Sequence, residues 1–198
     1  SQYIENFGCS VHLGRPLACR LYPLGRKIQN EEAHYIHEGK EFPCLADCPT
    51  VTELPQMTVG EYLKDQSTKT YESGQDIYLE LVQQLADIAF ELYLDSGLAA
   101  SGNKTTIDNW EKFGLLSPEE LPKSIREDWL KELIIPEIKE IKNPIEFATA
   151  HSQILFGKAQ TEFGSLTTLD ELENASTLIM AVALQLARSI GADAKGLS

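Results

Sequence analysis

All four cysteines of this chain lie within its first 48 residues, in a segment that is also rich in proline and glycine. Five of the nine prolines and four of the thirteen glycines precede residue 57. Because proline and glycine interrupt helices, we expect residues 1–56 to be irregular and to contain no long helix. So short a segment buries little apolar area, and a cross-link such as a bound metal ion is expected to hold it together.

The cysteines are Cys9, Cys19, Cys44 and Cys48, and we predict that they are metal ligands. Thiolates bind zinc and iron–sulfur clusters, and the 150 residues that follow contain no cysteine at all. Prolines flank the short Cys44–Cys48 loop, in which two sulfurs could reach one ion. Two alternatives stay open, since the cysteines could be buried free thiols or a local pair of disulfides.

A denser pattern surrounds the first two cysteines and has the form Cys-x-x-His-x-x-Arg-Pro-x-x-Cys-Arg-x-Tyr-Pro. Its fixed positions are filled by Cys9, His12, Arg15, Pro16, Cys19, Arg20, Tyr22 and Pro23. The pattern closely resembles the signature of the bacterial zinc- or iron-chelating cysteine-cluster proteins, the YkgJ-like family. It is similar, more distantly, to an element of the flagellin lysine N-methylases. The resemblance covers roughly residues 7–66, with Cys44 or Cys48 as the later cysteine before the helix start at Met57-Thr58-Val59.

The resemblance implies a bacterial protein in which a cysteine cluster binds zinc or iron. It also places His12, Arg15, Arg20 and Tyr22 as additional ligands or as neighbours of the metal site. The family pattern usually begins with a Cys-x-x-Cys-Cys-like cluster some tens of residues earlier, whereas this chain starts only eight residues before Cys9. We therefore expect either a longer native chain that supplies further ligands, or a site made from the four cysteines alone.

Three arginines, Arg15, Arg20 and Arg26, put positive charge beside these cysteines. Positive neighbours lower the pKa of a thiol and favour metal binding. The same charges could instead bind an anionic substrate or cofactor, or pair with acidic residues of the helices. Proline follows both Arg15 and Tyr22, which favours extended backbone there and is expected to hold the first two cysteines in a fixed loop.

Beyond residue 56 the pattern becomes helical, so we predict a mainly α fold: a metal-stapled segment, 1–56, followed by a helical bundle-like domain, 57–198. The expected helices run over 59–66, 75–95, 123–140 with a kink or break at Pro136, 144–162 and 169–190, with a polar loop at 98–106 and a helical turn starting at Ser117. Capping boxes at Thr58 and Thr168 and an apolar repeat of three or four residues support these assignments.

The two tryptophans and three of the histidines are expected to have structural and not functional roles. Trp110 and Trp129 are expected to pack between helices. We expect His34 and His37 to be exposed in a loop, and His151 to pack on its helix or face solvent.

The charge and hydropathy of the chain exclude several classes of partner. Thirty acidic and seventeen basic residues give a net charge of −13, which disfavours nucleic acids and anionic membranes. No transmembrane run or signal peptide is evident, so a cytoplasmic location is expected.

We therefore expect a metal-binding protein whose biological role is open, with an unidentified protein as a further partner. One alternative is an enzyme, a protein methyltransferase resembling flagellin lysine N-methylase. The chain has no glycine-rich cofactor loop, so this alternative rests on analogy, and no catalytic residue is assigned. The other alternative is an interaction module in which the metal staples a loop and the helical domain binds a partner.

Overall fold

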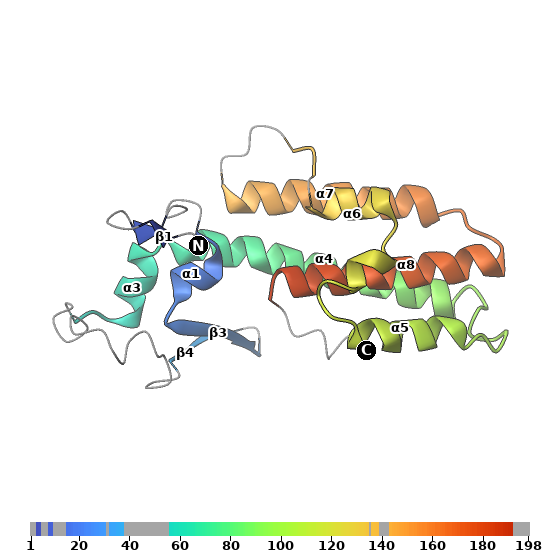
Figure 1. Ribbon diagram of the computed structural model, residues 1–198, viewed down its shortest axis with the longest axis horizontal. Helices are drawn as coiled ribbons and strands as arrows, with labels where there is room; N and C mark the ends of the chain where they lie inside the picture. The colour runs from blue at the N-terminus through green and yellow to red at the C-terminus, as the bar shows by residue number, and fades with distance from the viewer. Residues whose placement is uncertain are drawn as a thin grey trace. The chain divides into compact units, whose positions relative to one another are not determined.

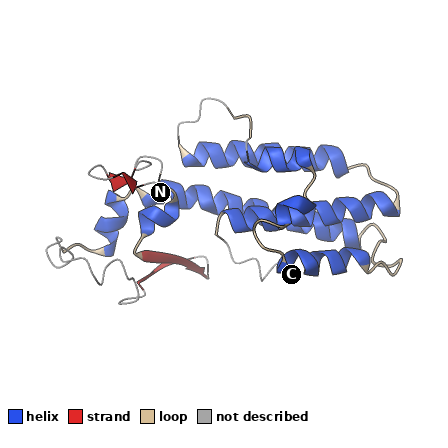
Figure 2. Cartoon of the chain, viewed as in Figure 1, coloured by secondary structure: helices blue, strands red, loops and turns tan. Residues whose placement is uncertain are grey.

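A computed structural model of the chain describes residues 3–4, 8–9, 15–30, 32–37, 56–134, 136–138 and 143–191. Its contacts define two compact units, Ser1–Glu72 and Ser73–Ser198, which divide within helix α4 (Thr68–Leu94). Helices predominate among the described elements, so the predicted mainly α fold is confirmed (Figures 1 and 2). The functional boundary expected after residue 56 stays a prediction.

The first unit contains short helices and two small antiparallel strand pairs. Its elements are β1 (Tyr3–Ile4), β2 (Gly8–Cys9), α1 (Leu17–Leu21), β3 (Leu24–Gln29), β4 (Glu32–His37), α3 (Val59–Asp65) and the first turn of α4. β1 pairs with β2, and β3 pairs with β4. The described part of 1–56 therefore contains more regular structure than expected, and no long helix lies in it, as predicted.

The β3–β4 hairpin follows from its turn. Gln29 pairs with Glu32, which leaves a two-residue connection, and Asn30 at its first position has φ of 52°. Tight hairpin turns require this left-handed conformation, and asparagine tolerates it better than most residues. The predicted helix start after residue 57 is confirmed, since Thr58 and Glu61 form a complete capping box at α3.

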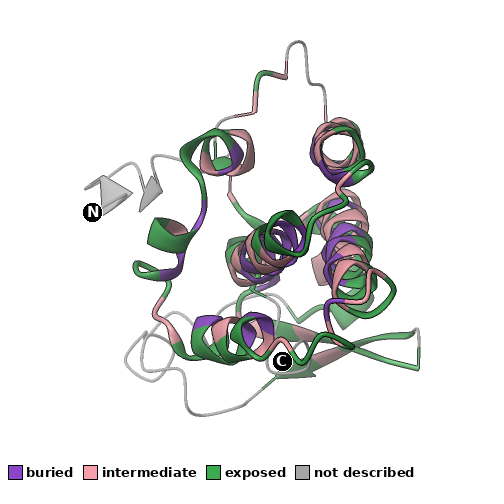
Figure 3. Ribbon diagram, turned by 90° about the vertical axis from the view of Figure 1, so that its right-hand side faces the viewer, coloured by how far each residue is buried: buried purple, intermediate pink, exposed green. Residues whose placement is uncertain are grey.

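The second unit is a helical core built around the last helix. Its further elements are α5 (Thr105–Leu115), the 3₁₀ helix η3 (Leu121–Ser124), α6 (Glu127–Ile134), α7 (Pro144–Phe163) and α8 (Leu169–Ser189). α5, η3 and α6 all pack against α8. Residues 179–183 of α8 are completely buried, and buried positions fall on the inner faces of the helices in Figure 3. A helix that is apolar around much of its circumference belongs in the centre of a core.

Most predicted helices of this unit are confirmed, with two corrections. α5 was not predicted and begins inside the expected polar loop, at Thr105. The helix expected over 123–140 is instead η3 and α6, and α6 ends at Ile134, two residues before Pro136. Proline disfavours helical backbone in the residue before it, which accounts for an end rather than a kink.

The helix expected over 75–95 is α4, which begins at Thr68, seven residues earlier than predicted. The starts of α7 and α8 were predicted from their caps. Asn143 accepts hydrogen bonds from two amides at the start of α7, and Thr168 forms a capping box with Glu171 at α8. Gly191, with φ of 74°, follows the end of α8 in the left-handed conformation that glycine adopts without strain. Among the described helices, none has the length and apolar character to cross a membrane.

Candidate functional site

Helix α1 carries the described part of the cysteine motif. Its thiol-bearing residue, Cys19, is exposed and forms no disulfide, whereas the next residue, Arg20, is buried with 8% of its surface exposed. Successive side chains on an α-helix point about 100° apart, so the two neighbours face different surroundings. Cys19 therefore lies on a helix, and the expectation of a fixed loop at this cysteine is wrong.

The guanidinium of Arg20 is buried and donates hydrogen bonds to neighbouring residues of the first unit. Its Nε donates to the carbonyl of Arg15 at 3.0 Å, and its Nη1 donates to the carbonyl of Gln66 at 2.9 Å. Its Nη2 donates to the hydroxyl of Tyr71 at 2.7 Å, and the guanidinium carbon lies 3.9 Å from the centre of the Tyr71 ring. Arg20 thus connects α1 with the end of α3 and the beginning of α4.

Two other motif residues make contacts in the same place. Arg15 donates from Nη2 to the Gln66 side-chain oxygen at 3.1 Å, and the hydroxyl of Tyr62 donates to the carbonyl of Tyr22. Three residues of the motif therefore hold α1 against the α3–α4 junction. Their additional place around a metal ion stays a prediction.

The hairpin is attached to α4 through Tyr35. The hydroxyl of Tyr35 lies 2.9 Å from each carboxylate oxygen of the buried Glu72. Burial, the hydrogen bond to Glu72 and its negative charge raise the pKa of Tyr35, whereas Arg26 acts in the opposite direction. Arg26 also lines a cavity of about 370 Å³ between α1 and the hairpin. Tyr35 is therefore a neutral donor that orients β4.

Of the four predicted cysteine ligands, only Cys19 has a side chain within the described residues. The backbone of Cys9 pairs with Tyr3 in the β1–β2 ladder, but its side chain lies outside the described residues, as do His12, Cys44 and Cys48. Within the described ranges, no three His, Cys, Asp or Glu side chains are grouped so that they could hold a metal ion. His34 and His37 are exposed as expected, although they lie in strand β4 and not in a loop.

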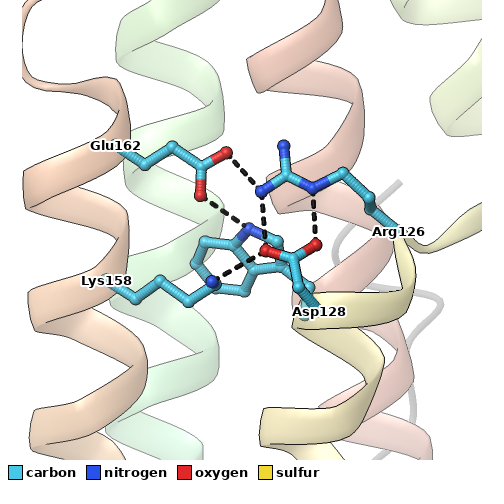
Figure 4. A network of polar contacts seen from close by, with 5 residues as sticks. Arg126, Asp128, Lys158 and Glu162 are labelled. Carbon is cyan, nitrogen blue, oxygen red and sulfur yellow. Dashed lines mark hydrogen bonds and ion pairs between the residues drawn. The ribbon is translucent and has the colours of Figure 1, made fainter.

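A charged network in the second unit connects α6 with α7 (Figure 4). Arg126 donates to both carboxylate oxygens of Asp128, at 2.5 and 2.8 Å, and pairs with Glu162 at 2.5 Å. Lys158 reaches Asp128 at 2.8 Å, and the Trp129 indole donates to Glu162 at 3.1 Å. The Arg126 hydrogen bond is the main reason that the pKa of Asp128 is lowered. Both carboxylates accept from cationic or N–H donors, as expected of a structural network. This network was not predicted from the sequence.

His151 is buried in the second unit. Of the two expected alternatives, packing or facing solvent, the structure shows packing. Its Nε2 lies 2.8 Å from the carbonyl of Glu132, and its Nδ1 lies 2.8 Å from the hydroxyl of Tyr78. A carbonyl only accepts, so Nε2 carries the hydrogen and Nδ1 accepts from Tyr78. Burial lowers the pKa of His151 and raises the pKa of Tyr78 to about 12, which keeps both groups neutral. This chain of hydrogen bonds connects α4, α7 and α6.

This burial predicts a pH dependence of stability. The lowered pKa of His151 means that the unfolded chain binds more protons than the folded chain once the pH falls below the ordinary value of 6.5. Stability is therefore expected to be independent of this group above that pH, and to fall below it with a slope of at most about 1.4 kcal/mol per pH unit. Urea unfolding between pH 5 and 8 measures the effect. His151→Gln should remove it, and the exposed control His34→Gln should not; equal profiles for the two variants would contradict the prediction.

No protein-family model, curated protein or solved structure matches this chain. The family resemblance therefore depends on the motif residues themselves.

Proposed function

We propose that this chain is a metal-binding protein in which thiolates of a cysteine cluster hold zinc or iron, or an iron–sulfur cluster. The candidate ligands are Cys9, Cys19, Cys44 and Cys48. The observation that carries the proposal is the exposed, unbridged thiol of Cys19 on a helix that the buried Arg20 fixes in place. A metal ligand must be accessible and must be held in position by its surroundings, and the exposed Cys19 beside the buried Arg20 meets both conditions.

The chemistry of the neighbouring residues also supports metal binding. Thiolate and imidazole are ligand types that zinc and iron bind in proteins, and the motif places Cys9 and His12 close to Cys19 in the chain. A bound metal would cross-link a segment that is short and rich in proline. A bacterial origin and a cytoplasmic location, where thiols stay reduced, agree with this role and are part of the proposal.

Metal analysis of anaerobically purified, reduced protein tests the proposal. We expect about one metal site per chain for the wild type and a loss of affinity of roughly tenfold or more for Cys19→Ser. Ala18→Ser is the matched control, because it introduces the same hydroxyl at the neighbouring exposed position of α1 and should leave metal content unchanged. Visible absorption distinguishes iron from zinc.

Two results would overturn the proposal. The first is a wild-type protein with far less than stoichiometric transition metal under these conditions. The second is full metal retention in Cys19→Ser. Counting alkylatable thiols before and after reduction separates a metal site from the disulfide alternative, because only disulfides release new thiols on reduction.

The methyltransferase-like alternative rests on the motif resemblance alone and is a second hypothesis. Transfer of a labelled methyl group to a lysine-containing protein tests it, and no transfer by the metal-loaded chain would count against it.

A further inference from the structure

A groove of about 510 Å³ lies between the C-terminal halves of α4 and α7 in the second unit. α4 lines it with Ile88, Glu91 and Leu92, and Asp95, directly after the helix, continues the same face. α7 lines the other wall with a face of the same spacing, which includes Phe156. Each wall is therefore a continuous strip of about two helical turns, or about 10 Å.

The floor of this groove is apolar and its rim is acidic. Leu92, Phe156 and Phe163 are among the apolar residues that line it, whereas Glu91 and Asp95 are exposed. No lysine, arginine or histidine is among the described lining residues. A ligand that complements this surface has bulky apolar groups next to positive charge.

The two carboxylates differ from those of the α6–α7 network. Asp128 and Glu162 are neutralised by Arg126 and Lys158, whereas Glu91 and Asp95 form no ion pair with any described residue. They lie four positions apart, Glu91 in the last turn of α4 and Asp95 directly after it, and like charges at this spacing repel each other. A cation bound between them would relieve this repulsion, and the net charge of −13 would attract it.

We propose that this groove docks a short basic amphipathic segment of another protein. Its lysine or arginine side chains contact Glu91 and Asp95, and its apolar side chains cover the floor at Phe156 and Phe163. Two turns of helical wall match the spacing of anchor residues in peptides that bind grooves as helices. Anionic membranes and nucleic acids are disfavoured because they would meet the same carboxylates with like charge.

The full chain and a fluorescein-labelled synthetic helix, with leucines on one face and lysines on the other, test the proposal by anisotropy. Reversing the rim charges in Glu91→Lys/Asp95→Lys is expected to weaken binding by about tenfold or more. The matched control is Glu111→Lys/Glu119→Lys, which makes the same charge change at exposed positions of α5 and of the turn after it, outside the groove. It should change binding by less than about twofold, since distant surface charges are screened by salt.

Two further variants test the groove without charge reversal, in case the lysine substitutions perturb folding. Glu91→Gln/Asp95→Asn removes the charges with little change of shape, and circular dichroism confirms that each variant is folded. Gln160→Trp changes no charge but places a ring at the exposed edge of the groove, and it should also weaken binding.

Three results would overturn the proposal. One is a wild-type chain that does not bind the peptide. Another is equal weakening by the rim and control double variants, which would indicate general charge attraction. The third is undiminished binding of a peptide whose leucines are replaced by serine, because the apolar floor would then contribute nothing.

Discussion

Replacing Arg20 by alanine is expected to lower the free energy of unfolding of the first unit by about 3 kcal/mol. The substitution removes the charge-assisted hydrogen bonds to Arg15, Gln66 and Tyr71 and leaves the first two carbonyls without this donor. It also removes the contact of the guanidinium with the Tyr71 ring. Loss of one partner from a buried charged network costs more than loss of a surface contact, since the remaining groups stay desolvated.

The measurement must report on the first unit alone. Both tryptophans lie in the second unit, so amide hydrogen exchange of residues 17–29 and 59–66 is the suitable observable. Arg15→Ala is the control, because this side chain is less buried than that of Arg20 and its bond to the Gln66 side chain is partly exposed, so about 1 kcal/mol or less is expected. Arg20→Lys should recover little, since an ammonium group cannot reproduce the planar fork. Equal effects of Arg20→Ala and Arg15→Ala would show that burial of the guanidinium does not matter.

Arg20 also gives a way to separate positioning from ligation. If the proposed metal site includes Cys19, Arg20→Ala should reduce metal affinity and destabilise the first unit together. Cys19→Ser should reduce metal affinity with little loss of stability in the metal-free chain, because the Cys19 side chain is exposed.

The parts of the fold that were predictable are those with local signals. Capping boxes at Thr58 and Thr168 and the side chain of Asn143 fix helix starts within four residues of sequence. A local signal also precedes α5: the side chain of Asn103 caps its first turn by accepting a hydrogen bond from the amide of Thr106. Ile107, Trp110 and Phe113 then follow at helical spacing.

The hairpin and the role of Arg20 were harder to predict for physical reasons. Most residues of β3 and β4 are exposed, so no alternation of buried and exposed positions is imprinted on the sequence. The acceptors of Arg20 at Gln66 and Tyr71 lie 46 and 51 positions away along the chain. Spacing within a motif cannot reveal partners so far along the chain. The sequence alone therefore could not show whether Arg20 lies near a metal site, binds an anion or supports the fold.

Trp129 is expected to be the most important single side chain of the second unit. It is completely buried, stacks on Phe163 with ring centres 5.8 Å apart, and donates its indole hydrogen to Glu162. Trp129→Ala should therefore cost about 3–5 kcal/mol, from lost apolar burial and from the cavity that remains. Urea unfolding followed by far-ultraviolet circular dichroism measures this loss.

Phenylalanine substitutions at the two tryptophans separate the packing of Trp129 from its hydrogen bond. Trp129→Phe keeps an aromatic ring but leaves Glu162 without the indole donor, which should cost about 1–3 kcal/mol. Trp110 is the matched comparison, because it is also buried but its Nε1 has no hydrogen-bond partner among the described residues. Trp110→Phe removes a similar volume and relieves an unpaired donor, so it should cost less than Trp129→Phe. If the two phenylalanine variants were equally destabilised, the α6–α7 network would contribute nothing through Trp129, and its stabilising effect would be limited to the exposed ion pairs.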